Sequence, residues 1–164
     1  MARTDPNKPT TVRFYQLGLS SLEAAVTGIL TKAWEKGMRA TLLTPGPDPT
    51  RYWDSLLWRT PADNFLPHGP DNGPDPDRQP ILIASSLNDQ NGATLVVLAT
   101  PQLIEEPANY DMVVDFVDGS SQEDLAASRK RYKQYRELGC HLEYWVQEPN
   151  RGWSLKNSTE ATQG

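Results

Sequence analysis

Five basic side chains lie within eight consecutive positions of the sequence: Arg129, Lys130, Arg131, Lys133 and Arg136. The surrounding segment contains no glycine or proline and is followed by Gly139, which predicts a helix over Gln122–Leu138. Residues three and four positions apart are neighbours on a helix, so Tyr132 shares one stripe with the basic side chains at positions 129, 133 and 136. Such a stripe suits an anionic ligand, although the same charges also fit an ordinary solvated helix face.

The chain as a whole is acidic, with 21 Asp and Glu residues against 16 Lys and Arg residues and a net charge of -5. Net negative charge repels a polyphosphate backbone, which argues against a dedicated duplex-DNA-binding protein. A short acidic peptide ending in an apolar side chain fits better, because a basic rim can surround an apolar pocket. We expect Val117 and Tyr132 to form the pocket floor, with micromolar, salt-sensitive affinity of about -8 kcal/mol.

A second unusual segment is Leu57–His68, in which Trp58 and Phe65 lie just before a stretch rich in Gly, Pro and Asp. Large apolar side chains in such a place form either a lid over the core or an anchor for a partner protein. The sequence leaves both interpretations open.

Several kinds of chemistry lack the residues that they need. The turn Leu17–Ser20 has neither of the glycine patterns that cradle phosphates. Two histidines and Cys140 are too few for an ordinary Cys/His metal site, so we expect no metal and no cofactor. Asp111 and Asp115 frame an apolar strand, but charged residues at strand ends are usually solvated, and we assign them no role.

The elements around these residues predict an α/β fold. Alternating apolar residues predict a strand over Thr11–Leu17, and apolar residues at helical spacing predict a helix from Leu22 to Gly37. Short apolar runs predict four further strands, at Ala40–Leu43, Ile81–Ala84, Leu95–Ala99 and Met112–Val117. Strand, helix and strand in succession favour a mostly parallel central sheet flanked by helices, which is a three-layer, nucleotide-binding-like domain without a nucleotide site.

We expect one domain over residues 1–148, with a long Pro/Gly/Asp loop at 69–80 and a flexible C-terminal tail at 149–164. The polar start lacks the pattern of a signal peptide, and no apolar run approaches the ~20 residues that span a bilayer. A cytoplasmic protein without membrane contact is therefore expected.

Two segments resemble one known family. Leu57–His68 matches the pattern L-W-x-R/T-x-P-A-x-x-F-x-P-H, and Val113–Val117 with Arg131–Arg136 matches a V-V-D-F-V strand followed by an R-Y-K-x-Y-R helix. These motifs, in this order, resemble the chi subunit of bacterial DNA polymerase III, and the resemblance covers roughly residues 12–142. It implies a non-catalytic clamp-loader subunit that joins the psi subunit to the acidic C-terminal tail of single-stranded DNA-binding protein, so contact with nucleic acid is indirect.

The resemblance also implies residue roles. Binding of the acidic tail falls on Val117, Arg129, Tyr132, Lys133 and, less strongly, Arg136. Binding of the psi subunit falls on Trp58 and Phe65, with Pro67 and His68 nearby. This chain departs from the family at Leu125, where the family can place a lysine, so the tail pocket is expected to be less basic unless Lys130 substitutes.

Two other functions remain open. A nucleotide-handling or hydrolytic α/β enzyme would have its site at the carboxyl ends of the strands. A protein that binds single-stranded DNA directly would use the same basic and aromatic side chains without a partner protein.

Overall fold

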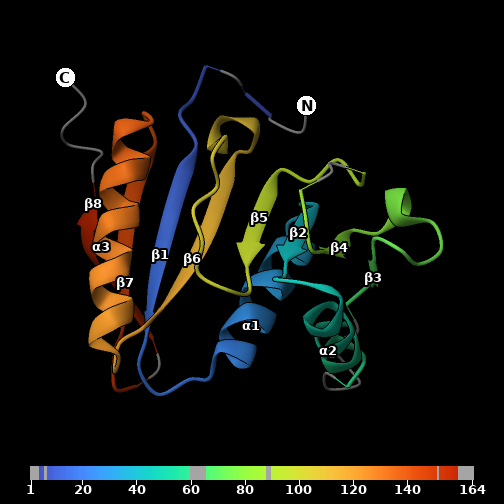
Figure 1. Ribbon diagram of the computed structural model, residues 1–164, viewed down its shortest axis with the longest axis horizontal. Coiled ribbons are helices and arrows are strands. Elements are labelled where there is room, and N and C mark those ends of the chain that lie inside the picture. Colours follow the sequence, from blue (N-terminus) through green and yellow to red (C-terminus); the bar gives the residue numbers. More distant parts are fainter. Residues whose placement is uncertain (1–3, 6, 60–65, 88–89, 151, 159–164) are drawn as a thin grey trace.

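The computed structural model describes residues 4–5, 7–59, 66–87, 90–150 and 152–158. Its described residues form one eight-stranded sheet with helices on both faces (Figure 1). The strand order is β3-β4-β2-β5-β6-β1-β7-β8, and each neighbouring pair is parallel except β7 with β8. The predicted α/β class, with a mostly parallel sheet flanked by helices, is confirmed.

The strands span β1 Thr11–Leu17, β2 Ala40–Leu43, β3 His68–Pro70, β4 Ile81–Ala84, β5 Leu95–Leu98, β6 Met112–Asp118, β7 His141–Gln147 and β8 Trp153–Ser158. The short central strands β2, β4 and β5 are buried at every position. Parallel strands covered on both faces read as continuous apolar runs, which is why these three were predictable from the sequence.

The helices are α1 Leu22–Glu35, α2 Pro47–Trp58 and α3 Gln122–Glu137, with short 3-10 turns at Pro76–Arg78 and Pro107–Asn109. Side chains of α1 and α2 share one core cluster with one face of the sheet. Tyr135 of α3 belongs to a second cluster with Phe14, Val117 and other residues of the opposite face. The sheet therefore has α1 and α2 on one side and α3 on the other.

Both ends of the sheet hold strands that the sequence did not predict. Gly69 and Pro70, expected in a loop over 69–80, belong to β3, which pairs with β4. The expectation of a flexible tail from residue 149 is wrong for Trp153–Ser158, which form β8 and pair antiparallel with β7. Trp153 contacts Tyr15 edge-to-face at 4.9 Å between ring centroids, and this contact fixes the strand on the sheet.

Candidate functional site

The basic segment forms α3, as its sequence pattern predicts. Ser121 caps the helix by accepting a hydrogen bond from the Asp124 amide at 3.1 Å. Acidic side chains occupy the first turn and Arg136 the last, which matches the helix dipole at both ends. The helix packs through its inward stripe, which consists of the buried residues Ser128, Arg131 and Tyr135.

One member of the basic cluster is therefore not available to a ligand. Arg131 forms a two-point ion pair with Asp115 of β6, with Nε–Oδ2 at 2.8 Å and Nη2–Oδ1 at 3.0 Å. The Asp115 side chain is fully buried, which corrects the expectation of a solvated carboxylate. Burial raises the pKa of Asp115 to about 6, against the opposing hydrogen bonds and charge of Arg131. Arg131 thus holds α3 to the sheet.

The outward stripe of α3 borders a cavity of about 310 Å³. Leu125, Arg129 and Tyr132 line it from the helix, Gln16 and Tyr144 from the sheet, and Asn157 from β8. The Tyr144 hydroxyl donates a hydrogen bond to the side-chain oxygen of Gln16 at 2.9 Å, which orders the floor. The cavity combines an aromatic floor with a cationic helix edge.

The Tyr132 hydroxyl is buried and lacks a hydrogen-bond partner among the described residues. Its ring packs on Phe14 at 5.7 Å between centroids. Burial raises the pKa of Tyr132, so the hydroxyl stays protonated and able to donate at neutral pH. A buried donor without an acceptor costs about 1–3 kcal/mol.

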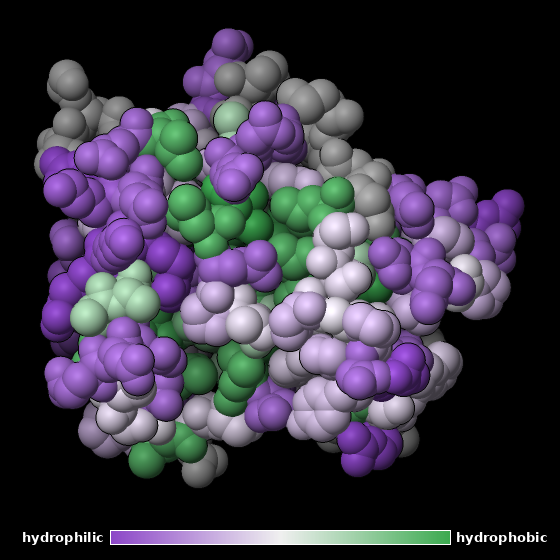
Figure 2. All heavy atoms as spheres, viewed as in Figure 1, coloured by the Kyte–Doolittle hydropathy of each residue, from purple (hydrophilic) through white to green (hydrophobic). Residues whose placement is uncertain are grey.

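The other residues expected at this site lie in different environments. Val117 is fully buried in the core cluster beneath α3, so it supports Tyr132 and Tyr135 but does not line the cavity. Lys133 and Arg136 are exposed on α3. Hydrophilic side chains cover the flank of the molecule formed by α3, and apolar ones gather beside it over the strands (Figure 2). Leu125 lines the cavity at the position where a lysine was considered.

The second expected site lies at the end of α2, far along the sheet from α3 (Figure 1). Trp58 is 58% exposed, and its ring lies 4.9 Å from that of His68. His68 is buried, and its Nδ1 lies 2.6 Å from the Leu66 carbonyl oxygen. Pro67, which directly precedes His68 in the sequence, is half-buried, and Phe65 lies outside the described residues. His68 therefore supports the Trp58 ring from below.

A cavity of about 610 Å³ lies at the carboxyl ends of β1, β5 and β6. In open α/β sheets this is where ligands bind when neighbouring strands lead to helices on opposite faces, as β1 and β6 do here. Its charged lining residues are Asp118 and Asp124. Hydrogen bonds from Ser120 lower the pKa of Asp118, so this carboxylate is negatively charged at neutral pH. A bound phosphate group would instead need hydrogen-bond donors or positive charges at this position. The charges that line this cavity therefore disfavour a phosphate group.

The described residues form neither a cluster of metal ligands nor a membrane-spanning helix. No group of three or more His, Cys, Asp or Glu side chains there is arranged to hold a metal ion. No helix within those residues is long and apolar enough to cross a bilayer.

Comparison with known proteins identifies the family of this chain. The model of the family described as "DNA polymerase III chi subunit, HolC" matches residues 10–143 of this chain. The chain belongs to the DNA polymerase III chi subunit family. It is 33% identical over 132 residues to "DNA polymerase III subunit chi" of Escherichia coli (strain K12), a match that covers 76% of this chain and 85% of the relative. It is 27% identical over 77 residues to "Probable DNA polymerase III subunit chi" of Rickettsia prowazekii (strain Madrid E), covering 47% of each.

Placed on the chi fold, the sequence motifs divide into two surfaces on opposite halves of the sheet: the α3 cavity and the Trp58 end of α2. Three residues of the α3 cavity were missed by the sequence analysis: Gln16, Tyr144 and Asn157. Tyr144 could have been found, because strand alternation puts it on the same face as Leu142, the face that packs against α3. No sequence signal pointed to Asn157.

Proposed function

We propose that this chain is a non-catalytic subunit of the DNA polymerase III clamp loader. It bridges the psi subunit and the acidic C-terminal tail of single-stranded DNA-binding protein during replication. The observation that carries the proposal is the cavity beside α3, where Arg129 borders an aromatic floor and the buried Tyr132 hydroxyl has no acceptor within the described part of the chain. An acidic peptide with a terminal aromatic side chain supplies an anion for the rim, an apolar group for the floor and an acceptor for the hydroxyl.

The cationic rim of this site comes from three exposed side chains of α3: Arg129, Lys133 and Arg136. Exposed ion pairs contribute about 0.2–1 kcal/mol each, whereas burial of one aromatic side chain contributes about 1.5–3 kcal/mol. The aromatic anchor therefore dominates affinity, and the charges give orientation and salt sensitivity.

A fluorescent peptide of sequence Asp-Asp-Ile-Pro-Phe tests the tail site by anisotropy. The wild-type protein is expected to bind at micromolar concentration, and Arg129→Ala and Lys133→Ala each to weaken binding about two- to fivefold. Lys36→Ala removes the same charge from the C-cap of α1, on the opposite face of the sheet, and serves as the control. Absence of binding at tens of micromolar, or equal loss in all three variants, contradicts the proposal.

The psi subunit is proposed to bind at the end of α2 through Trp58, with Phe65, Pro67 and His68. A tryptophan with more than half of its surface exposed, supported from below by a buried histidine, fits a protein–protein anchor. Trp58→Ala is expected to abolish co-purification with psi while the fold persists. Tyr52→Ala, which truncates another exposed aromatic residue on the same helix, is the control. If Trp58→Ala unfolds the protein, Trp58 belongs to the core instead.

Two rival functions have their own tests. An enzyme acting on nucleotides would use the cavity at the carboxyl ends of the strands, whose carboxylates disfavour phosphate. Nucleotide binding by the wild-type protein that Asp118→Asn alters would favour that enzyme. Direct binding of single-stranded DNA predicts a gel shift with the isolated chain, whereas the adaptor function predicts none.

A further inference from the structure

The cavity beside α3 has a wall that lies beyond the matched part of the family. The family model ends at residue 143, and β8 spans Trp153–Ser158. Asn157 of β8 lines the cavity together with Arg129 and Tyr132 of α3. Figure 1 shows β8 at the edge of the sheet next to α3, with β7 between β8 and β1. The groove is therefore closed on the side that the sheet edge would otherwise leave open.

A bulge directs Asn157 into this groove. The pairing of β7 with β8 is Tyr144 with Asn157 and Trp145 with Leu155, so Lys156 is the extra residue. Residues opposite each other in an antiparallel pair point to the same face. Asn157 therefore shares the α3 face with Tyr144, whereas Leu155 shares the other face with Trp145. Without the bulge, Asn157 and Leu155 would point to the same face of the sheet. The bulge is therefore the reason why the Asn157 amide points to the α3 face.

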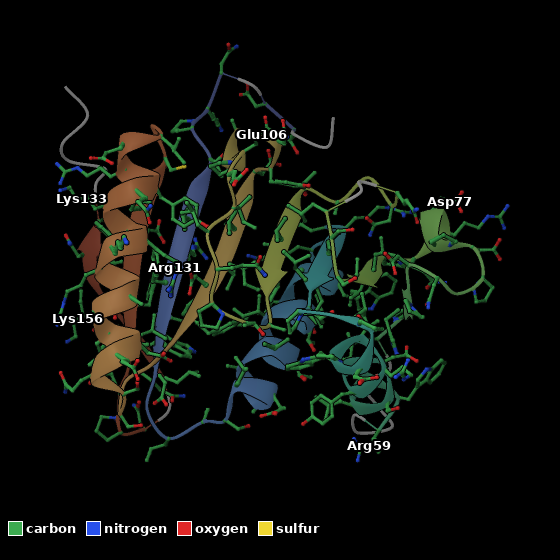
Figure 3. All side chains as sticks on the ribbon, viewed as in Figure 1. Arg59, Asp77, Glu106, Arg131, Lys133 and Lys156 are labelled. Carbon is green, nitrogen blue, oxygen red and sulfur yellow. The ribbon has the colours of Figure 1, made fainter. Side chains whose placement is uncertain are left out.

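The bulge also places a cation at the edge of the groove. Lys156 is exposed, and its Nζ lies 3.4 Å from Glu148 Oε1. Both side chains of this pair are about half exposed, so the pair is weak and easily exchanged for another anion. Lys156 and Lys133 point outward on the same flank of the molecule, the one formed by α3 and β8 (Figure 3).

We infer that β8 is the second wall of the acidic-peptide site, with Asn157 binding the peptide main chain and Lys156 attracting its carboxylates. This inference rests on the proposed tail-binding function. An amide side chain offers both a donor and an acceptor, which matches the alternating groups of a peptide backbone. The position that the family can fill with lysine holds Leu125, which lines the cavity, and the exposed Lys156 next to Asn157 in β8 supplies a positive charge on the same flank. Residues outside the matched segment thus set affinity and selectivity in this chain.

Anisotropy titrations with the peptide Asp-Asp-Ile-Pro-Phe test the role of β8. Asn157→Ala is expected to weaken binding about three- to tenfold, and Asn157→Asp to weaken it further because the new carboxylate repels the ligand. Lys156→Ser is expected to weaken binding about two- to fivefold at low salt and to have no effect at high salt. Leu155→Ala, on the opposite face of the same strand, is the matched control and should bind as the wild type does.

The outcomes separate the two ideas. Wild-type protein that fails to bind the peptide contradicts the tail-binding function itself. A different result would overturn only the role of β8. In that case the wild-type protein binds the peptide and Arg129→Ala weakens binding, but the Asn157 and Lys156 variants bind as tightly as the wild type does. Amide exchange of β8 in each variant establishes that the strand remains paired, so that a loss of affinity reports the side chain and not a detached strand.

Discussion

Arg131 and Asp115 form a buried ion pair that joins α3 to β6, with two nitrogen–oxygen distances of 2.8 and 3.0 Å. The guanidinium also lies 6.0 Å from the centroid of the Phe14 ring. This pair determines the orientation of the whole helix. With Arg131 pointing into the sheet, Leu125, Arg129 and Tyr132 line the cavity on another side of the helix, opposite Gln16 and Tyr144 of the sheet.

Removal of Arg131 is expected to be strongly destabilising. Arg131→Met keeps most of the side-chain volume but leaves the Asp115 carboxylate buried without its partner, which costs about 3–5 kcal/mol. The measurement is urea denaturation followed by circular dichroism. Lys130→Met changes the exposed neighbour and should stay within about 0.5 kcal/mol of the wild type. Equal stabilities of the two variants would show that the ion pair is not needed for the fold.

Asp115 also predicts a pH dependence. Its pKa is raised from 3.8 to about 6 in the folded protein, so the folded state binds a proton more tightly than the unfolded state does. The contribution of Asp115 to the free energy of unfolding is therefore present at low pH. It is lost, by up to about 3 kcal/mol, as the pH rises from about 4 to about 6. The free energy of unfolding relative to Asp115→Asn should fall between pH 4 and 6 and then level off. A rise over the same interval would show that the pKa of Asp115 is lowered.

The sequence predicted most of the fold but did not show that one cation of the charge cluster, Arg131, is buried against the sheet. Buried parallel strands and the uninterrupted helical segment leave direct patterns, and these were found. Arg131 was counted in the charge cluster but left out of the stripe formed by positions 129, 132, 133 and 136, and its packing against the sheet was not predicted. The spacing of Ser128, Arg131 and Tyr135 carried that information, since a helix with few apolar residues must pack through polar ones. Asp115 was the matching carboxylate, sixteen positions away.

The missed strand has a different cause. Trp153–Ser158 has four polar residues among six, and three of the six are exposed, so neither alternation nor a continuous apolar run marks it. Edge strands need only one neighbour, and this one is fixed by a ring contact with Tyr15, 138 positions earlier in the chain. Contacts of such sequence separation leave no local signal. The cavity wall at Asn157 was missed for the same reason.

The buried hydroxyl of Tyr132 predicts opposite effects on stability and on binding. Tyr132→Phe removes a donor that has no acceptor among the described residues, so the melting temperature should stay equal or rise. The same change removes a hydrogen bond to the bound peptide, and affinity should fall about threefold or more. Thermal denaturation and peptide anisotropy on one preparation measure both. A lower melting temperature with unchanged affinity would mean that the hydroxyl has a structural partner and does not serve the ligand.

Trp153 is expected to control whether the groove has its second wall at all. Its ring contacts Tyr15 edge-to-face, an arrangement that contributes about 0.5–1.5 kcal/mol beyond burial of the ring. In Trp153→Ala the edge strand loses this contact while β1, β6 and β7 keep theirs, so amide exchange should accelerate in β8 and remain slow in β6. Peptide affinity should fall together with the protection of the β8 amides from exchange, because a strand that leaves the sheet takes Asn157 out of the groove.

Leu155→Ala, which truncates a half-exposed side chain of the same strand, should change neither the peptide affinity nor the amide exchange of β8. Loss of protection throughout the sheet would show that β8 belongs to the cooperative core, and unchanged affinity despite a detached β8 would show that the peptide uses α3 alone.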